Sequence, residues 1–414
     1  MKDIYSSIFA EWKERRKEGL VPRTNPMSKY AGLKPRKIIA ATGLRRVGKT
    51  CMLYQLAGQE RDKILYINFD DERIPARTEF LTGLVPAIKN MLDVRPETLF
   101  LDEVHSLPDW SRWLRRIYDE DDFEIFVTGS GAQLSSEEIP YELRGRCLEV
   151  RVRPLSYAEF LVFKDKSAGT AALLEEYLLY GGMPEVVLAG GDVKLDMLRQ
   201  YYSTVIRRDI IERFRIRNSE ALKAMLKLLA NSTQFSFTKL YNTIRSMQMK
   251  VGKTAILKYM SHVESSYLLR SVPILSPKVK DQMRHPRKVY FEDTGFVSAL
   301  STRFSKNYGR LCENAVANGL SSKGYTLHYW KSTDGREVDF AVRTDGGVEA
   351  LVQSCWEPWE DSTLKREMSA LVTASAELRC DNLLVVTQDR AGTEEHRGKK
   401  IKFIRLDDWL MEDG

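Results

Sequence analysis

The chain has 414 residues, of which 43% are hydrophobic and 29% are charged, and its formal net charge is +7. This balance excludes a chain too polar to fold, and the length predicts two to four domains at roughly 100–200 residues each. The mild basic excess allows a polyanionic partner such as nucleic acid. It does not require one, because a solvated surface with some extra lysine and arginine has the same net charge.

Neither a membrane span nor a secretory leader is predicted. The chain has no run of about 18 apolar residues, and its N-terminal stretch MKDIYSSIFAEWKERRKEG lacks the apolar centre of a signal peptide. The cysteines form no CxxC pair and no Cys/His cluster, which argues against zinc and against a disulfide framework. We therefore expect a cytoplasmic protein without a membrane partner. The cysteines are Cys51, Cys147, Cys312, Cys355 and Cys380.

The first half of the chain predicts an alternation of strands and helices. An amphipathic N-terminal helix, with Ile4, Ile8 and Trp12 on one face, is followed by a connector rich in proline and glycine. Alternating strands and helices then predict a mostly parallel sheet, whose ligands bind at the carboxyl ends of the strands. The expected strands are 37–42, 63–69, 98–102, 123–128 and 147–152, and the expected helices are 50–58, 78–92 and 110–118.

The second half changes character after Pro154. Residues 156–263 are predominantly helical, and a short hairpin is expected over 266–291. From about residue 307 a second α/β segment begins, so the fold class is α/β, with a mainly helical region between the two α/β segments. Its expected elements are helix 307–322, strands YTLHYW, EVDFAV and VEALVQS, helix 362–377, and strands NLLVVT and KIKFIRL.

One motif follows the first strand directly. GLRRVGKT matches the pattern G-x-x-x-x-G-K-[ST], with an apolar strand before it and a helix after it. Such a loop wraps phosphates with its backbone N–H groups, Lys49 contacts the β- and γ-phosphates, and Thr50 binds Mg²⁺. We therefore expect ATP or ADP, with Mg²⁺, as ligands. The residues expected to contact the nucleotide are Gly43, Leu44, Arg45, Arg46, Val47, Gly48, Lys49, Thr50 and Cys51.

A second GKT tripeptide, at residues 252–254, is not expected to bind nucleotide. Met247 stands where the pattern needs its first glycine, and no strand precedes the tripeptide. We interpret it as the start of a helix.

The third strand ends in the acidic pair Asp102 and Glu103. A buried strand would deliver Asp102 to the edge of the sheet, where its carboxylate can hold Mg²⁺, and Glu103 would polarise the attacking water. The alternative is an acidic pair that only caps the next helix. Adjacent Asp and Glu favour hydrolysis over simple binding.

Further polar residues follow the next strand. Thr128 and Ser130 are placed to sense the γ-phosphate or to orient the water, although an ordinary turn after a strand is the alternative. Arg144 and Arg146 come shortly afterwards, and an arginine can stabilise charge in the transition state from the same or a neighbouring subunit. The alternative for the two arginines is a surface turn.

These segments carry a family likeness. GLRRVGKT, FLDEVHSLPDW, VTGSGAQL and LRGRCLEVRVRPLSYAEF resemble a prokaryotic family of AAA+ ATPases with an additional C-terminal domain. The likeness continues through YLLYGGMPEV, FEDTGFVSAL and GRLCENAV to EVDFAV and ALVQSC, so it spans nearly the whole chain. It implies that Thr128 is the residue that senses the γ-phosphate. It also implies that Arg146 is the best candidate for the arginine that stabilises charge in the transition state. The implied division is 1–34 N-terminal helix and connector, 35–155 ATPase core, 156–218 helical lid, 219–300 winged helix and 301–414 restriction-endonuclease-like domain.

The winged-helix segment suggests a DNA contact. Its second helix of the pair, residues 253–264, would be the recognition helix, and the hairpin loop 277–288 is strongly basic. Double-stranded or branched DNA could be bound there through phosphate contacts. The alternative is a protein-packing module with a solvated loop. The helix residues expected to be exposed are Lys253, Thr254, Lys258 and Tyr259.

The C-terminal segment departs from the pattern of active nucleases with this fold. Such enzymes use Asp, Glu and Lys around a metal ion. Glu313 and Asp339 are suitably placed, but Gln353 and Cys355 stand where the pattern has Glu and Lys. We therefore expect a nuclease-like domain that has lost or nearly lost cleavage, with Glu313 and Asp339 in a structural or weak binding role.

The leading hypothesis is thus a Mg²⁺-dependent ATPase whose appended domains contact DNA. The alternative is an ATP-dependent conformational switch with slow turnover that acts through protein contacts. A nuclease gated by ATP is a third hypothesis. A homo-oligomer with arginine supplied in trans is compatible with the sequence, as is a monomer.

Overall fold

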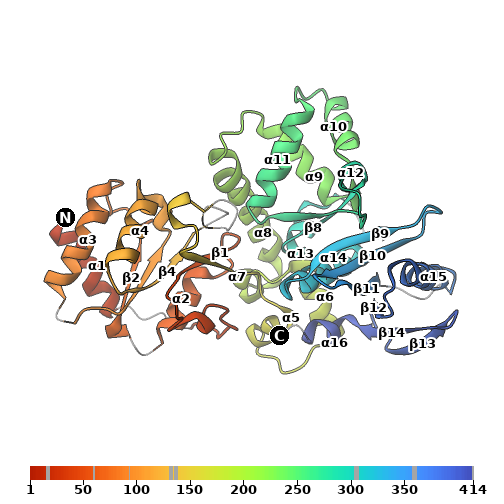
Figure 1. Cartoon of the computed structure of the whole chain (residues 1–414), viewed down its shortest axis with the longest axis horizontal. Coiled ribbons are helices and arrows are strands. Elements are labelled where there is room, and N and C mark those ends of the chain that lie inside the picture. The colour runs from red at the N-terminus through yellow and green to blue at the C-terminus, as the bar shows by residue number, and fades with distance from the viewer. Residues whose placement is uncertain are drawn as a thin grey trace. The chain divides into compact units, whose positions relative to one another are not determined.

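The computed structural model describes residues 1–14, 19–58, 61–92, 94–129, 134, 139–302, 307–356 and 361–412. Two compact units make up the chain, Met1–Val152 and Arg153–Gly414. Both combine helices and sheets, as Figure 1 shows. No helix in these described ranges has both the length and the apolar sequence needed to cross a membrane.

The first unit is built on a five-stranded sheet with the order β2-β3-β4-β1-β5. Every pairing in this sheet is parallel, which confirms the expected α/β class. The strands are short and largely buried, as parallel strands covered on both faces must be. Their bounds are β1 Ile38–Thr42, β2 Ile64–Asn68, β3 Thr98–Asp102, β4 Glu124–Thr128 and β5 Cys147–Arg151.

Helices precede and connect these strands. They are α1 Lys2–Glu14, α2 Lys49–Ala57, α3 Thr78–Met91 and α4 Trp110–Glu120, with the short 3-10 turns η1 Ser28–Tyr30, η2 Arg61–Lys63, η3 Val104–Ser106 and η5 Tyr141–Leu143. The expected face of α1 is inward: Ile8 and Trp12 are buried, and Ile4 is half-buried. Trp12 stacks on Tyr66 of β2 with ring centroids 5.3 Å apart, and its indole N–H donates to the carbonyl of Ile64.

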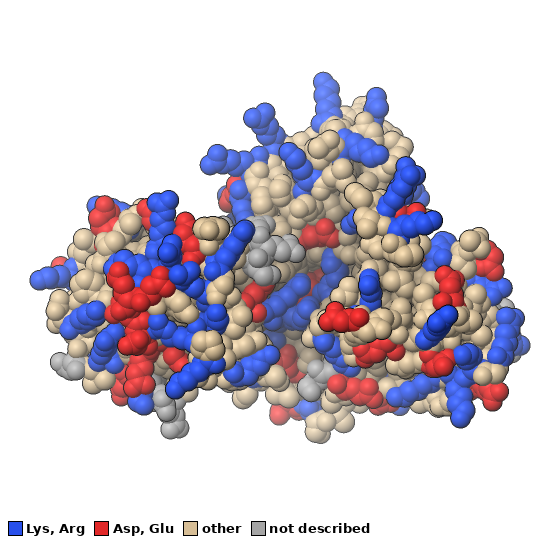
Figure 2. Space-filling model, viewed as in Figure 1, with Lys and Arg blue, Asp and Glu red and all other residues tan. Residues whose placement is uncertain are grey.

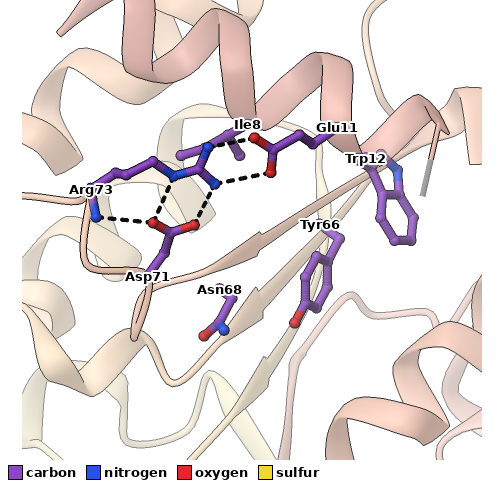
Figure 3. A pocket seen from close by; sticks show the side chains of 7 residues that line it. All are labelled: Ile8, Glu11, Trp12, Tyr66, Asn68, Asp71 and Arg73. Carbon is purple, nitrogen blue, oxygen red and sulfur yellow. Dashed lines mark hydrogen bonds and ion pairs between the residues drawn. The ribbon is translucent and has the colours of Figure 1, made fainter. Parts of the chain in front are cut away.

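An ion pair closes the outer side of this contact. Figure 3 shows the guanidinium of Arg73 between the carboxylates of Glu11 and Asp71, at the rim of a small cleft that Ile8 and Trp12 also line. The hydrogen bond from Arg73 lowers the pKa of Glu11 to about 2. Because these charged groups are exposed, the buried aromatic contact holds α1 more strongly than the ion pair does.

The second unit begins with a helical region. Its helices are α5 Tyr157–Phe163, α6 Ala171–Tyr180, α7 Pro184–Leu188, the turn η6 Gly191–Val193, α8 Lys194–Thr204, the π-helix η7 Val205–Glu212 and α13 Thr294–Leu300. Asp293 joins two segments of this region: its carboxylate accepts from the N–H groups of Gly182 (2.8 Å) and Gly295 (2.9 Å). A Cβ at Gly181 would lie 1.8 Å from this carboxylate. The GGMP and FEDTG segments are therefore packed on each other, and burial raises the pKa of Asp293 to about 7.

Three helices and a small antiparallel sheet come next. The helices are α9 Ser219–Ala230, α10 Phe237–Ser246 and α11 Lys253–Ser265, and the strands β6 Gln234–Phe235, β7 Leu269–Val272 and β8 Arg287–Phe291 pair in the order β6-β8-β7. The expected hairpin is present, since β7 and β8 are antiparallel. Its loop contains a helix that the sequence did not predict, α12 Val279–Arg284.

A six-stranded mixed sheet completes the unit, with the order β13-β14-β12-β11-β10-β9. Its elements are α14 Tyr308–Ser322, β9 Thr326–Lys331, β10 Glu337–Thr344, β11 Gly347–Cys355, α15 Asp361–Leu378, β12 Leu383–Thr387, β13 Gly392–His396, β14 Lys399–Arg405 and α16 Leu406–Met411. Strand β13 was not expected from the sequence. It is an edge strand with the polar sequence GTEEH, which gives no apolar signal.

Candidate nucleotide-binding site

The loop between β1 and α2 depends on its first glycine. Gly43 has φ 136°, and a Cβ on it would lie 2.1 Å from the carbonyl oxygen of Val152. Gly48, which precedes α2, also has a positive φ of 93°. Only glycine accepts both the conformation and the close approach at residue 43. The backbone is thus held in the tight turn that the motif predicts.

Lys49 begins α2 and folds back over this loop. Its ammonium donates to the carbonyl oxygens of Gly43 (3.0 Å) and Leu44 (2.9 Å), and the residue is only 6% exposed. The positive end of the helix dipole lies at the same place. Together, the helix N-terminus and the ammonium make this loop suitable for a polyphosphate.

The remaining loop residues differ in exposure. Leu44 and Val47 are buried, Arg45 and Cys51 are half-buried, and Arg46 is exposed with a left-handed φ of 69°. A non-glycine residue in this region is strained, and such strain is common where a backbone is shaped for a ligand. The backbone of the loop, more than its side chains, is therefore what a phosphate would meet.

The carboxylate of Asp102 is the meeting point of three elements. One of its oxygens accepts from the hydroxyls of Thr50 and Tyr66, each at 2.7 Å. The other accepts from the hydroxyl of Thr128, which also accepts the backbone N–H of Glu103 at 3.2 Å. The sheet explains this meeting, because β3 and β4 are neighbours and their carboxyl ends lie at one edge. Four residues expected from the sequence are thus brought together.

Glu103 follows Asp102 in a strained conformation, with φ 54° and ψ 35°. Its carboxylate lies 3.4 Å from Nδ1 of His105, so a protonated His105 would pair with it. A left-handed glutamate costs of order 1–3 kcal/mol and is held only where the surroundings determine it. Ser130, the other residue expected after β4, lies outside the described residues.

Three contributors were not foreseen. Tyr66 belongs to the largely buried strand β2, and its only signal in the sequence is a hydroxyl between two apolar neighbours. Arg23 belongs to the connector, and its guanidinium donates to the carbonyl of Val47 at 2.7 Å. Asn25 adds a bond from its amide to the carbonyl of Met52 at 2.9 Å. The connector therefore braces the loop and α2 from outside.

Arg146 lies away from this group. Its carbonyl accepts the N–H of Ile38, at the amino end of β1, whereas the loop follows the carboxyl end. Five residues of strand separate these ends, about 13–17 Å at the usual rise. Its guanidinium is bound by Asp119 of α4 at 3.1 and 3.3 Å, and this hydrogen bond lowers the pKa of Asp119. One chain therefore does not bring Arg146 to Lys49.

Comparisons with known proteins agree with this geometry. An uncharacterized protein of Methanocaldococcus jannaschii, MJ1544, is 32% identical over 381 residues, which cover 87% of this chain and 84% of that protein. The chain belongs to the family of MJ1544. An uncharacterized protein of Haemophilus influenzae is 26% identical over 79% of this chain and 84% of its own length. Residues 35–161 match the family profile described as AAA domain.

A solved structure supports the fold. The Walker-type ATPase PABY2304 of Pyrococcus abyssi superposes with a TM-score of 0.51 at 15% identity, over 69% of this chain and 97% of that chain. With the AAA match, this likeness identifies the fold of the first unit as that of P-loop ATPases. Residues 171–307 and 308–398 match two domains of unknown function, DUF8612 and DUF4143.

Two expectations for the second unit were wrong in part. On α11, Lys253, Thr254 and Lys258 are exposed as predicted, but Tyr259 is only 8% exposed and packs inward. Lys288, expected at the end of the basic hairpin loop, is instead part of β8 and is 2% exposed. It is the second residue of β8, and both faces of this strand are covered, since Val289 and Tyr290 are buried as well.

The four C-terminal residues singled out by the nuclease comparison are close to one another. Glu313 and Asp339 both bind the ammonium of Lys288, at 2.9 and 2.6 Å. Gln353 accepts the N–H of Asp339 at 3.0 Å, and Cys355 is buried at the end of the same strand, β11.

We predict that Gly43→Ala lowers the melting temperature far more than Gly145→Ala does. Gly145 also has a positive φ, 76°, but a Cβ on it would meet nothing within 4 Å. Gly145→Ala therefore adds only left-handed strain of about 1 kcal/mol, roughly 2–4 °C. Gly43→Ala adds the clash with Val152, so we expect about 3 kcal/mol or more and roughly 6–12 °C. Thermal denaturation of the two variants checks this. Equal shifts would show that the clash is relieved at little cost.

Proposed function

We propose that this protein binds ATP with Mg²⁺ in the loop Gly43–Thr50 and hydrolyses it. The observation that carries the proposal is that Thr50, Asp102 and Thr128 meet at the edge of the sheet next to this loop. The hydroxyl and carboxylate oxygens of Thr50 and Asp102 suit Mg²⁺, which takes oxygen ligands. When bound, the ion would neutralise charge on the phosphates.

The protein side chains have separate tasks in this mechanism. Lys49 leaves the carbonyls of the loop and binds the β- and γ-phosphates. Glu103 orients a water for in-line attack on the γ-phosphorus and polarises its O–H bond. Thr128 links the two acids, because it donates to Asp102 and accepts from the backbone of Glu103.

Tyr66 and Arg23 hold this arrangement without touching the nucleotide. The hydroxyl of Tyr66 donates a hydrogen bond to Asp102 and so fixes the plane of its carboxylate. Arg23 fixes the carbonyl of Val47, which keeps the neighbouring N–H groups of the loop in place.

We predict that one substitution in this site weakens ATP binding and that another slows turnover without weakening binding. Lys49→Ala removes a charge-assisted contact to phosphate, so ATP affinity should fall about 10- to 100-fold. Glu103→Gln keeps the shape of the side chain and removes its basicity, so binding should persist while turnover falls about 10²- to 10⁴-fold. Binding of a fluorescent ATP analogue and release of phosphate measure the two effects. Full turnover in Glu103→Gln would remove Glu103 from the mechanism.

We propose that Arg146 acts in trans, within a homo-oligomer. It lies at the edge of the sheet opposite to the loop, where a neighbouring copy can reach it, and Asp119 holds its guanidinium in one orientation. An arginine at the γ-phosphate stabilises charge that develops in the transition state.

Mixing two inactive variants tests this arrangement. Arg146→Ala should lower turnover about 10³-fold or more, whereas Arg144→Ala, at an exposed neighbour, should not. A mixture of Glu103→Gln and Arg146→Ala protomers should regain turnover, because some sites then combine an intact Glu103 with an intact Arg146 of the next copy. Full activity of Arg146→Ala alone, or no recovery in co-assembled mixtures, would exclude a role in trans.

We propose further that ATP turnover is coupled to DNA, bound by α10 and α11. In this proposal residues 219–300 form a winged helix with α11 as recognition helix, and residues 156–218 form the lid. Figure 2 shows Lys and Arg side chains projecting from this part of the chain, at the top of the view. The exposed basic residues of these two helices and their connection are Lys239, Arg245, Lys250, Lys253 and Lys258.

The same segment contains almost no acidic residues that would repel a phosphate backbone. Glu264 is the one acidic residue between Phe237 and Ser265, and it accepts from the N–H (2.9 Å) and the hydroxyl (2.6 Å) of Ser271. A surface of one sign attracts a polyanion and releases its counterions on binding. This charge pattern favours DNA over the alternative of a switch that acts through protein contacts.

We predict that duplex or branched DNA raises the rate of ATP turnover and binds with a strong salt dependence. The double variant Lys253→Ala/Lys258→Ala should reduce the slope of log affinity against log salt by about 2. The control Lys400→Ala/Lys402→Ala removes equal charge from exposed positions on β14 and should leave the slope unchanged. If no DNA alters turnover and no salt-sensitive binding is found, the result supports the alternative of an ATP-dependent switch that acts through protein contacts.

A further inference from the structure

A buried lysine lies between three carboxylates in the second unit. The ammonium of Lys288, whose side chain is 3% exposed, contacts Glu313 of α14 at 2.9 Å. It also contacts Glu337 at 3.1 Å and Asp339 at 2.6 Å, both from β10. A lysine is almost never this deeply buried unless it is paired. Here the pairing is threefold and brings together elements that are distant in the sequence.

The carboxylates are also satisfied by other donors of the protein. Asp339 accepts the N–H of Ser354 at 3.0 Å, and Glu313 accepts the hydroxyl of Tyr290 at 2.7 Å. Glu337 accepts the amide of Gln234 at 2.6 Å. Although burial alone would lower it, the pKa of Lys288 is held well above its ordinary value by the neighbouring carboxylates. The neighbouring carboxylates therefore favour the charged form of the lysine.

We propose that Lys288 is the resident cation of this centre and takes the place that a divalent metal ion would otherwise occupy between Glu313, Glu337 and Asp339. Three carboxylates directed at one point resemble the ligands of a hard cation, and without a positive charge they would repel one another. In the part of the chain that the structure describes, no group of three or more His, Cys, Asp or Glu side chains is arranged to hold a metal ion. This finding agrees with an ammonium, not a metal ion, among the three carboxylates.

Gln353 is a second, independent sign of the same arrangement. Its side chain accepts the N–H of Asp339 at 3.0 Å and donates to Glu367 at 2.7 Å, and it is 5% exposed. A glutamate here would add another buried negative charge, and it could not donate to Glu367. A neutral amide therefore suits a centre whose cation is a single ammonium, whereas a divalent ion would tolerate a further carboxylate.

The resident cation also joins two sheets. Lys288 and Gln234 come from the three-stranded sheet, and Glu337 and Asp339 come from the six-stranded sheet. Backbone bonds reinforce this junction, since the N–H of Leu275 donates to the carbonyl of Tyr329 at 2.7 Å. The acids thus serve to pin the DNA-contacting region of our functional proposal to the C-terminal sheet, not to cleave a phosphodiester with a metal ion.

The test follows Mn²⁺ binding and melting temperature in the full, nucleotide-free chain. Any Mn²⁺ binding of wild type should be independent of Asp339, so Asp339→Asn should leave it unchanged. Asp102→Asn identifies any ion that is bound near the nucleotide loop instead. Lys288→Met leaves three acids without their cation, so it should melt roughly 10 °C lower. It should then gain Mn²⁺ binding and Mn²⁺-dependent stabilisation, both removed by adding Asp339→Asn. Lys331→Met, which removes a 41% exposed lysine beside Glu337, should show neither effect.

Two results would overturn the proposal. One is Mn²⁺ binding to wild type that is lost in Asp339→Asn, since the centre would then hold metal beside the lysine. The other is a folded Lys288→Met that gains no Mn²⁺ binding. If Lys288→Met does not fold at all, the comparison of wild type with Asp339→Asn decides alone: Mn²⁺ binding common to both, or to neither, supports a resident lysine.

Discussion

The first unit depends on the need to satisfy one buried carboxylate. Asp102 is 3% exposed, and a buried charge is tolerated only when hydrogen bonds replace the water it has lost. Those bonds come from Thr50 of α2, Tyr66 of β2 and Thr128 of β4. These bonds are possible because β2, β3 and β4 are neighbours in the sheet, with their carboxyl ends at one edge. The oxygens of Asp102 and Thr50 are also those that would hold the magnesium ion of our functional proposal.

In the second unit, a buried positive charge has the same need for partners. Lys288 is a buried cation, and its partners come from a helix and from a strand of another sheet. A buried charge without its partners destabilises the fold, so each of these groups links the elements that supply its partners. Asp293 acts in the same way, since it binds the N–H groups of two glycine-containing segments that are far apart in the chain.

Local patterns predicted most of the fold. The strands of the first unit and the helices α2, α3 and α11 agree within a few residues with their expected ranges, because buried strands and amphipathic helices have clear periodicity. Strand β13 and helix α12 were missed, since a polar edge strand and a short exposed helix carry no such signal. Tyr259 was assigned to the wrong face of its helix, and packing against the other helices decides that face.

The sequence by itself determined the glycine-containing loop Gly43–Thr50 and the acidic pair Asp102 and Glu103, because each is a motif of contiguous residues. Only the tertiary structure decided which groups support them. Tyr66 reaches Asp102 through strand pairing, Arg23 reaches Val47 through the path of the connector, and Lys288 reaches its acids by crossing from one sheet to another. No spacing in the sequence encodes such contacts, because each depends on where two distant segments meet.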